Sequence, residues 1–194
     1  MSECRPVIFL NGPPRCGKDT LAEHIAKVLP GFTVVKFAHV LKEKTHALYG
    51  APEIPHDFFE HCKDELSTFF LGVTPRQAYI AVSEKLLKPL HGEEIFGELL
   101  VNKMSTLNGR AFIISDSGFV SEANPVLKEY GAENCALIRI HAKGRGCSFR
   151  NDSRSYINLP CESFDIENNG TIDQFLKRGT WRLQCILQEM VGGQ

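Results

Sequence analysis

The chain has 194 residues, a formal net charge of −1 and a hydrophobic fraction of 43%. This length suits one domain with a sizeable core, and the near-neutral charge excludes a protein that binds nucleic acid through a strongly basic overall field. The sequence has no apolar run long enough for a membrane span, no signal-peptide pattern and only scattered cysteines, so we expect a cytoplasmic protein without a membrane partner.

Strand-like and helical patterns alternate along the whole chain. Short apolar runs are typical of buried strands, and apolar residues three and four apart indicate helices. The predicted strands are 7–11, 33–37, 111–115, 136–141 and 164–167. The predicted helices are 19–29, 40–48, 58–70, 75–87, 93–107, 122–130 and 171–190. This alternation predicts an α/β fold, in which one domain spanning residues 1–194 has a parallel sheet with helices on both faces.

A glycine-containing loop separates the first predicted strand from the first predicted helix. Its residues are Gly12, Pro13, Pro14, Arg15, Cys16, Gly17, Lys18, Asp19 and Thr20, in the pattern G-x-x-x-x-G-K-x-T. Such a loop turns backbone N–H groups and a helix N-terminus toward one point, which suits a phosphate. Gly12 and Gly17 allow the tight backbone, and Lys18 reaches a β- or γ-phosphate. The whole loop is therefore predicted to bind ATP.

Mg²⁺ is expected beside the phosphates, because phosphoryl transfer depends on positioning groups and neutralising charge. Candidate ligands are Asp19 and Thr20 in the loop, and Asp116, which ends the third predicted strand as a Walker-B carboxylate does. Asp19 stands where Ser or Thr usually follows the lysine, so it is either near the metal or a base on an acceptor hydroxyl. For Asp116 a turn-forming aspartate is the alternative. Lys18, Asp19 and Asp116 are the candidate catalytic residues of this region.

Residues 142–162 have little apolar periodicity, which predicts a mobile lid. Its cations are Lys143, Arg145, Arg150 and Arg154, with only Asp152 as a close acid. Arginine pairs bidentately with phosphate, so Arg150 and Arg154 are candidate catalytic residues that stabilise the transferred group. A solvated basic loop is the alternative.

Arg76 stands in the first turn of a predicted helix, after a Thr74 cap and Pro75. The helix dipole disfavours a cation there, so Arg76 needs an anionic partner. We identify it as a candidate acceptor-binding residue, with a surface ion pair as the alternative.

In this order, the motifs resemble those of the deoxynucleoside monophosphate kinases of bacteriophages, within the P-loop family that includes thymidylate kinases. The segments that carry the resemblance are 12–20, 36–38, 74–76, 114–122, 137–139 and 166–171. The resemblance implies a P-loop NTPase fold with a five-stranded parallel sheet. It also implies a helical acceptor-binding insertion at about residues 40–107 and an arginine lid.

Two segments depart from the family pattern. These kinases usually carry Asp-Val-Arg-Phe after the third strand, with the arginine near the substrate phosphates. Here the run is Asp116-Ser117-Gly118-Phe119, without the arginine. Residues 82–88 also replace the usual Gly-Thr-Glu-like stretch. A monophosphate acceptor benefits from that cation, whereas a hydroxyl acceptor benefits from a carboxylate base.

A related branch of phage kinases phosphorylates the hydroxymethyl group of 5-hydroxymethyldeoxyuridine in DNA, during thymidine hypermodification. The missing arginine favours this acceptor and a DNA partner, although the near-neutral charge counts against DNA. One alternative is a kinase that makes deoxynucleoside diphosphates from free monophosphates. Another is a non-catalytic nucleotide-binding regulator, and a small-metabolite kinase shares the fold.

Overall fold

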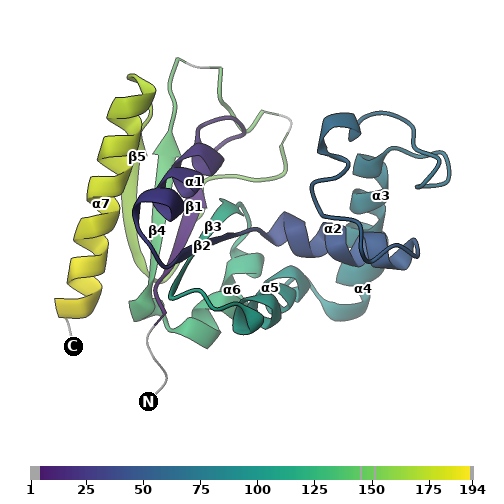
Figure 1. Cartoon of the computed structure of the whole chain (residues 1–194), viewed down its shortest axis with the longest axis horizontal. Coiled ribbons are helices and arrows are strands. Elements are labelled where there is room, and N and C mark those ends of the chain that lie inside the picture. Colours follow the sequence, from purple (N-terminus) through teal and green to yellow (C-terminus); the bar gives the residue numbers. More distant parts are fainter. Residues whose placement is uncertain (1–4, 145, 151, 193–194) are drawn as a thin grey trace.

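The computed structural model of the protein describes residues 5–144, 146–150 and 152–192 (Figure 1). Its centre is a five-stranded sheet in the order β2-β3-β1-β4-β5, and each neighbouring pair of strands is parallel. The strands are β1 (Val7–Asn11), β2 (Phe32–Val35), β3 (Ala111–Ser117), β4 (Cys135–His141) and β5 (Glu162–Glu167). The predicted α/β fold with a parallel sheet is confirmed.

Helices cover both faces of this sheet (Figure 1). On one face, α1 (Lys18–Val28) and α7 (Ile172–Gly192) pack against Ile8 and Leu10 of β1. On the other, α5 (Ile95–Thr106) and α6 (Val120–Tyr130) pack against Val7 and Phe9. All four strand residues are fully buried, since a parallel sheet between two helical layers has no solvent face.

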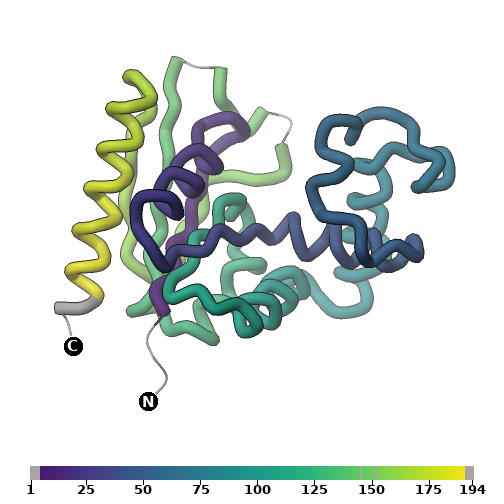
Figure 2. Tube along the Cα trace, in the orientation of Figure 1, coloured from purple at the N-terminus to yellow at the C-terminus, as the bar shows by residue number. Residues whose placement is uncertain are grey.

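The segment between β2 and β3 extends to one side of the sheet (Figure 2). It contains α2 (Phe37–Leu48), the 3₁₀ turn η1 (Glu60–Cys62), α3 (Pro75–Val82), the π-helical turn η2 (Ser83–Leu87) and α4 (Lys88–His91), and continues into α5. Thr74 and Gln77 form a capping box at the start of α3. The π-helical turn η2 widens the helix within residues 82–88, the stretch whose sequence differs from that of the phage kinases. Such turns are frequent at functional sites.

The predicted helix over residues 58–70 is wrong. Only η1 is helical there, and an isolated antiparallel bridge joins Ser67 to Val73. Phe69 and Phe70 both pack against the rings of His46 and Tyr49, within the aromatic cluster of this segment. Adjacent residues of a helix point about 100° apart, so tertiary packing favours the turn over the helix.

A smaller difference concerns the boundary between β2 and α2. Phe37, predicted to end the second strand, is instead the first residue of α2. Its amide is bound by a side chain from β3, a contact that no local sequence pattern encodes. Among the described residues, none of the helices combines the length and the apolar character needed to span a membrane.

Candidate active site

The loop between β1 and α1 has the geometry of an anion-binding site. Gly17 precedes α1 in a left-handed conformation with a φ of 103°, and no side chain caps the helix. A Cβ at Gly17 would lie 2.9 Å from both Asn168 Nδ2 and Phe175 Cε1, so only glycine fits. The first N–H groups of α1 therefore remain available to an anion, which the helix dipole also favours.

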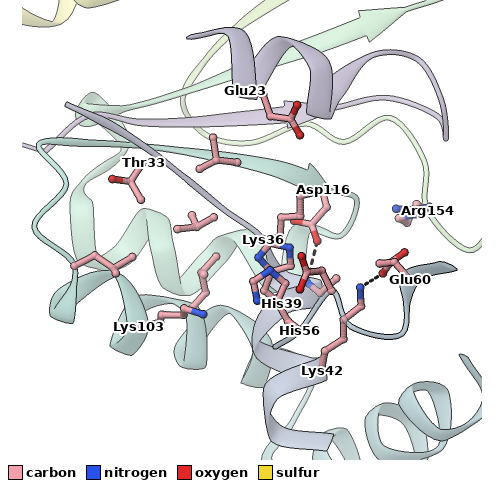
Figure 3. A pocket seen from close by; sticks show the side chains of 16 residues that line it. Glu23, Thr33, Lys36, His39, Lys42, His56, Glu60, Lys103, Asp116 and Arg154 are labelled. Carbon is pink, nitrogen blue, oxygen red and sulfur yellow. Dashed lines mark hydrogen bonds and ion pairs between the residues drawn. The ribbon is translucent and has the colours of Figure 1, made fainter. Parts of the chain in front are cut away.

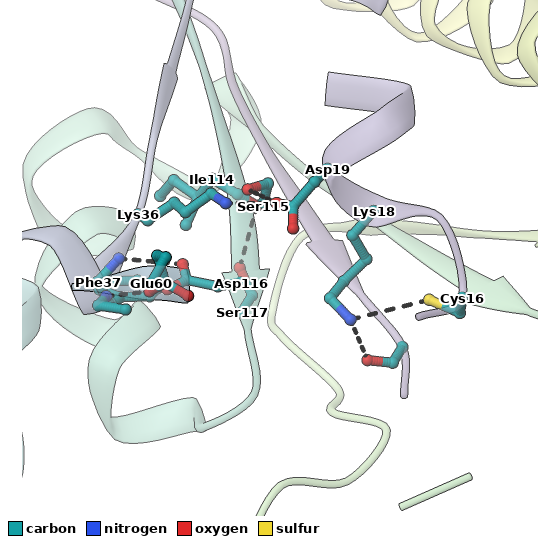
Figure 4. A network of polar contacts seen from close by, with 12 residues as sticks. Cys16, Lys18, Asp19, Lys36, Phe37, Glu60, Ile114, Ser115, Asp116 and Ser117 are labelled. Carbon is teal, nitrogen blue, oxygen red and sulfur yellow. Dashed lines mark hydrogen bonds and ion pairs between the residues drawn. The ribbon is translucent and has the colours of Figure 1, made fainter. Parts of the chain in front are cut away.

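Lys18 is the buried cation of this loop. Its Nζ donates hydrogen bonds to the carbonyl oxygens of Gly12, at 2.6 Å, and Pro13, at 2.9 Å (Figure 4). Burial lowers the pKa of Lys18, and the positive charge of Arg154 lowers it further, while the Cys16 sulfur opposes the shift. Phosphate oxygens would relieve this unfavourable burial of charge, because they offer Lys18 an anionic partner.

Two buried asparagines hold the loop and the lid segment (residues 142–161, between β4 and β5) in place. Asn168 Nδ2 donates to the Cys16 carbonyl at 2.9 Å, which fixes the middle of the loop. Asn11 Nδ2 donates to the carbonyl oxygens of Ser117 and Ser155, and its Oδ1 accepts from the Ile157 amide. Asn11 therefore joins β1, the end of β3 and the lid segment.

Asp19, the unusual residue of the loop, contacts β3 and Lys36, the residue between β2 and α2. Its Oδ1 accepts from Ser115 Oγ at 2.7 Å and pairs with Lys36 Nζ at 2.6 Å (Figure 4). Burial raises the pKa of Asp19, but the hydrogen bonds from Lys36 and Ser115 outweigh burial and hold this pKa below its usual value. An ionised carboxylate thus stands next to Lys18, at the start of α1.

Asp116 has a structural role that the sequence did not predict. Its Oδ1 accepts from the Phe37 amide at 3.0 Å and its Oδ2 from the Ala38 amide at 2.9 Å, so it caps α2 from the end of β3 (Figure 4). Burial raises the pKa of Asp116, while the two amides favour the charged form. Its role toward a metal or an acceptor stays a prediction.

The oxygen donors at the start of α1 fit the expected magnesium ion. Asp19 and Thr20 are both exposed on the first helical turn, and Mg²⁺ prefers one or two such oxygens together with phosphates and water. Asp116 fits less directly, because each of its oxygens already accepts an amide hydrogen bond. No group of three or more His, Cys, Asp or Glu residues able to hold a metal occurs in the described part of the chain.

Arg154 is a cation of the lid segment, and its charge acts on Lys18 of the loop. It forms a bidentate ion pair with Asp152, at 2.6 and 2.8 Å, and its aliphatic stem packs over Gly118. Arg150 is exposed, and its amide donates to Ser148 Oγ. Arg145 lies outside the described residues. The structure therefore places Arg154 beside the phosphate loop and leaves Arg150 in solvent.

A cavity of about 950 Å³ lies between the helical segment, the end of β3 and the lid segment. Its apolar lining includes Phe37, Phe96 and Phe119. Charged residues from three parts of the chain also line it. The helical segment between β2 and β3 contributes Lys42, Glu60, Lys63, Arg76, Glu84 and Lys88. Strand β3 contributes Asp116, α6 contributes Glu122, and the lid segment contributes Asp152 and Arg154. Small-molecule sites typically measure ~300–1,000 Å³, so the volume suits a nucleotide-sized acceptor.

Arg76 lines this cavity, as an acceptor-binding residue would, but its charge is already compensated. Its Nε lies 2.5 Å from Asp64 Oδ1 and its Nη2 3.2 Å from Asp64 Oδ2. Both side chains are mostly exposed. The surface ion pair named as the alternative is thus present, and an acceptor phosphate would have to displace Asp64.

A second cavity, of about 770 Å³, adjoins the first and is lined by Lys36, His39, His56 and Lys103 (Figure 3). The two imidazole rings stack at 3.5 Å between centroids. The Lys42–Glu60 ion pair lines both cavities, as do Asp116 and Arg154. The cations of this second cavity have acidic partners, Asp19 for Lys36 and Glu43 for Lys103, so it is not a strongly basic surface.

Sequence reasoning missed three site residues. Asn11 and Asn168 carried no signal beyond their position at the ends of strands. Glu122 belongs to the stretch that carries the family resemblance, but nothing in that stretch indicated that its carboxyl would lie in a cavity wall. Contacts between distant segments decide all three placements.

No protein-family model and no curated relative matches the sequence. Among solved structures, the chain is similar to a structure described as shikimate kinase from Acinetobacter baumannii in complex with shikimate, with a TM-score of 0.46 and 14% sequence identity, over 99% of this chain and 96% of that one.

Proposed function

We propose that this protein is an ATP- and Mg²⁺-dependent kinase that transfers the γ-phosphate of ATP to a deoxypyrimidine nucleotide, with the 5-hydroxymethyl group of 5-hydroxymethyldeoxyuridine in DNA as the favoured acceptor. The observation that carries the proposal is the position of Arg154. Its charge acts on Lys18 of the phosphate loop and on Asp116 and Glu122 of the larger cavity. A cation between the two halves of the site is what a transferred phosphoryl group needs.

On the donor side, the loop amides and Lys18 would hold the ATP phosphates. Asp19 and Thr20 would hold Mg²⁺, which supplies charge neutralisation on the phosphate oxygens. Arg154 would exchange part of its pairing with Asp152 for the transferred group, because a guanidinium pairs equally well with phosphate.

The charges of the larger cavity favour a hydroxyl acceptor over a phosphate acceptor. Its two arginines, Arg76 and Arg154, are each paired bidentately with an aspartate. A monophosphate would bring about two negative charges into this already balanced site. A hydroxyl group needs no such cation and gains from a nearby carboxylate, of which Asp19 and Asp116 are the candidates.

One observation favours a second candidate, a kinase of free deoxynucleoside monophosphates. The stem of Arg154 occupies the space over Gly118, the position at which the family pattern has its arginine. Arg154 would then supply the missing cation from the lid segment. The monophosphate alternative therefore needs the same test.

The test compares acceptors with labelled ATP and the intact protein. An oligodeoxynucleotide with 5-hydroxymethyldeoxyuridine should gain label, and the matched oligonucleotide with thymidine, which lacks the hydroxyl, should gain none. Free deoxynucleoside monophosphates are assayed side by side. Absence of label in the hydroxymethyl substrate contradicts the proposal, and efficient diphosphate formation supports the second candidate. If no acceptor is labelled while ATP still binds, the alternatives left are the nucleotide-binding regulator and the small-metabolite kinase.

A further inference from the structure

Glu122 is a carboxyl group of the larger cavity that the proposed transfer does not use. It lies in the first turn of α6 and lines the cavity together with Asp116. In the part of the chain that the structure describes, no hydrogen bond or ion pair links its carboxyl to another residue. The side chain is half-buried at the wall of the cavity, so a molecule bound there can pair with this carboxyl.

The surroundings of Glu122 decide its protonation. Burial, followed by the nearby charge of Asp116, raises the pKa of Glu122 to about 8. The other charged groups that face it are Lys88 of α4 and Arg154 of the lid segment, which lower the pKa, and Glu84 of η2, which raises it. Burial raises the pKa of Asp116 as well, against the two amide hydrogen bonds that favour its charged form. With a pKa of about 8, the Glu122 carboxyl is mostly protonated at neutral pH.

The backbone of Glu122 is held firmly. Gly97 of α5 lies so close to α6 that a Cβ there would clash with the Glu122 carbonyl oxygen and approach the Pro125 ring to 2.8 Å. The first turn of α6 is thus packed against α5, so the backbone that carries the Glu122 side chain has a fixed position at the cavity wall. Polar groups that are fixed at a cavity wall are the usual source of ligand orientation.

A protonated carboxyl offers one donor and one acceptor side by side. Uracil presents the complementary pair on one edge, with N3–H as donor and O4 as acceptor. The apolar side chains that share the cavity, Phe37, Phe96 and Phe119, suit the faces of such a ring. An ionised carboxylate has acceptors only and would repel O4.

We propose that Glu122 is a specificity-determining residue of the acceptor site, where its carboxyl group, at the cavity wall beside Phe119, pairs with the N3–H and O4 edge of the acceptor pyrimidine. This inference rests on the proposed kinase function and names the base class that the site reads. It also predicts a property that a purely structural glutamate would lack, which is loss of acceptor affinity when Glu122 ionises.

The experiment measures kcat and KM for the hydroxymethyl acceptor as functions of pH in wild-type protein, E122Q and E122A. Wild-type kcat/KM should fall about tenfold per pH unit above the pKa of Glu122, about 8. E122A should raise KM by about 10- to 100-fold at neutral pH, because the base edge is left unpaired. E122Q should recover most of that loss, since an amide also offers a donor and an acceptor, and it should lack the alkaline fall.

Glu129→Gln is the matched control, because Glu129 is an exposed carboxyl on the same helix. It should leave kcat, KM and the pH profile unchanged. Ionisation of the base itself affects all variants alike and so cancels in the comparison. Thermal unfolding curves identify any variant that fails to fold, and E122Q, which is isosteric, remains informative if E122A does not fold.

The inference is overturned if E122Q keeps the wild-type alkaline fall, or if folded E122A has a wild-type KM. Failure of the proposed function has a different signature, since wild-type protein would then label no hydroxymethyl acceptor at any pH. The pH profile and the acceptor screen therefore separate the two proposals.

Discussion

The aliphatic stem of Arg154 lies on the backbone of Gly118, with no room for a side chain between them. A Cβ at Gly118 would lie 2.5 Å from both Cγ and Cδ of Arg154, which is closer than Cβ contacts allow. The glycine after β3 therefore leaves the space in which the Arg154 stem lies, at the wall of the larger cavity. The run Asp116-Ser117-Gly118-Phe119 contains no arginine, and in the structure an arginine of the lid segment occupies the space over Gly118.

Gly118→Ala should displace Arg154 and lower kcat/KM for phosphoryl transfer. We expect a loss of about 10- to 100-fold, since the misplaced cation stabilises the transition state less well. The variant Arg154→Ala should lose at least as much. Steady-state kinetics of the two single variants and of the double variant test this coupling.

The double variant Gly118→Ala/Arg154→Ala should be no slower than Arg154→Ala alone, because the alanine then has nothing left to displace. Fully additive losses would mean that the contact between Gly118 and Arg154 has no part in the activity.

Lys18→Ala should abolish most of the transfer without unfolding the protein. Removing one preorganised cation from a phosphoryl-transfer site lowers the rate by about 10²–10³-fold. The loop keeps its support from Asn168, so thermal unfolding should change little. Kinetics together with ATP binding measured by calorimetry check this. A variant with wild-type turnover would remove the loop from the mechanism.

Asp116→Asn separates the capping role of Asp116 from the predicted metal role. An amide can accept from only one of the two backbone N–H groups of α2, so the free energy of unfolding should fall by about 1–2 kcal/mol. Urea denaturation measures this fall. The Mg²⁺ concentration for half-maximal rate should stay near that of wild type. A severalfold increase would instead assign Asp116 to the metal.

His39 should make the fold sensitive to mild acid. Burial, then the charges of His56, Lys36, Lys42 and Lys103, lowers the pKa of His39 from 6.5 to about 3. The unfolded chain thus binds the proton more readily, and the stability from neutral His39 is present above pH 6.5 and lost as pH falls toward 3.

The measurement for His39 is urea denaturation of wild-type protein and His39→Gln at two pH values. Between about pH 7 and 5, the wild type should lose about 1–2 kcal/mol more than the variant. Equal losses would show that His39 titrates normally in the folded protein.

Asn11→Ala should destabilise the fold and loosen the lid segment. The change leaves the carbonyl oxygens of Ser117 and Ser155 and the amide of Ile157 without their partner. Unsatisfied buried polar groups of this kind cost about 1–3 kcal/mol each, and water will compensate some of them, so we expect a total of about 2–4 kcal/mol. Thermal or urea unfolding measures the change, and proteolysis should cut the lid segment faster.

The local sequence was enough to predict the sheet and the glycine-containing loop between β1 and α1, while phosphate binding by this loop stays a prediction. β1 has the predicted bounds, and the remaining strands differ from prediction by only a few residues at their ends. Apolar runs and the glycine–lysine loop are local signals, because burial of a parallel strand and binding of a phosphate both depend on consecutive residues. The cap at Thr74 was predicted for the same reason.

What only the tertiary structure decided are the contacts between segments far apart in the chain. Asp116 caps α2 across 78 residues, and Asn11 binds the lid segment across 144. Phe59 and Phe70 pack on His46, and the segment that carries them forms turns instead of a helix. The charge of Asp116 shifts the pKa of Glu122, and the stem of Arg154 fills the space over Gly118. Burial and charge at such positions come from residues that are distant in the sequence. The local sequence therefore determined the loop between β1 and α1, and only the tertiary structure determined which residues line the larger cavity.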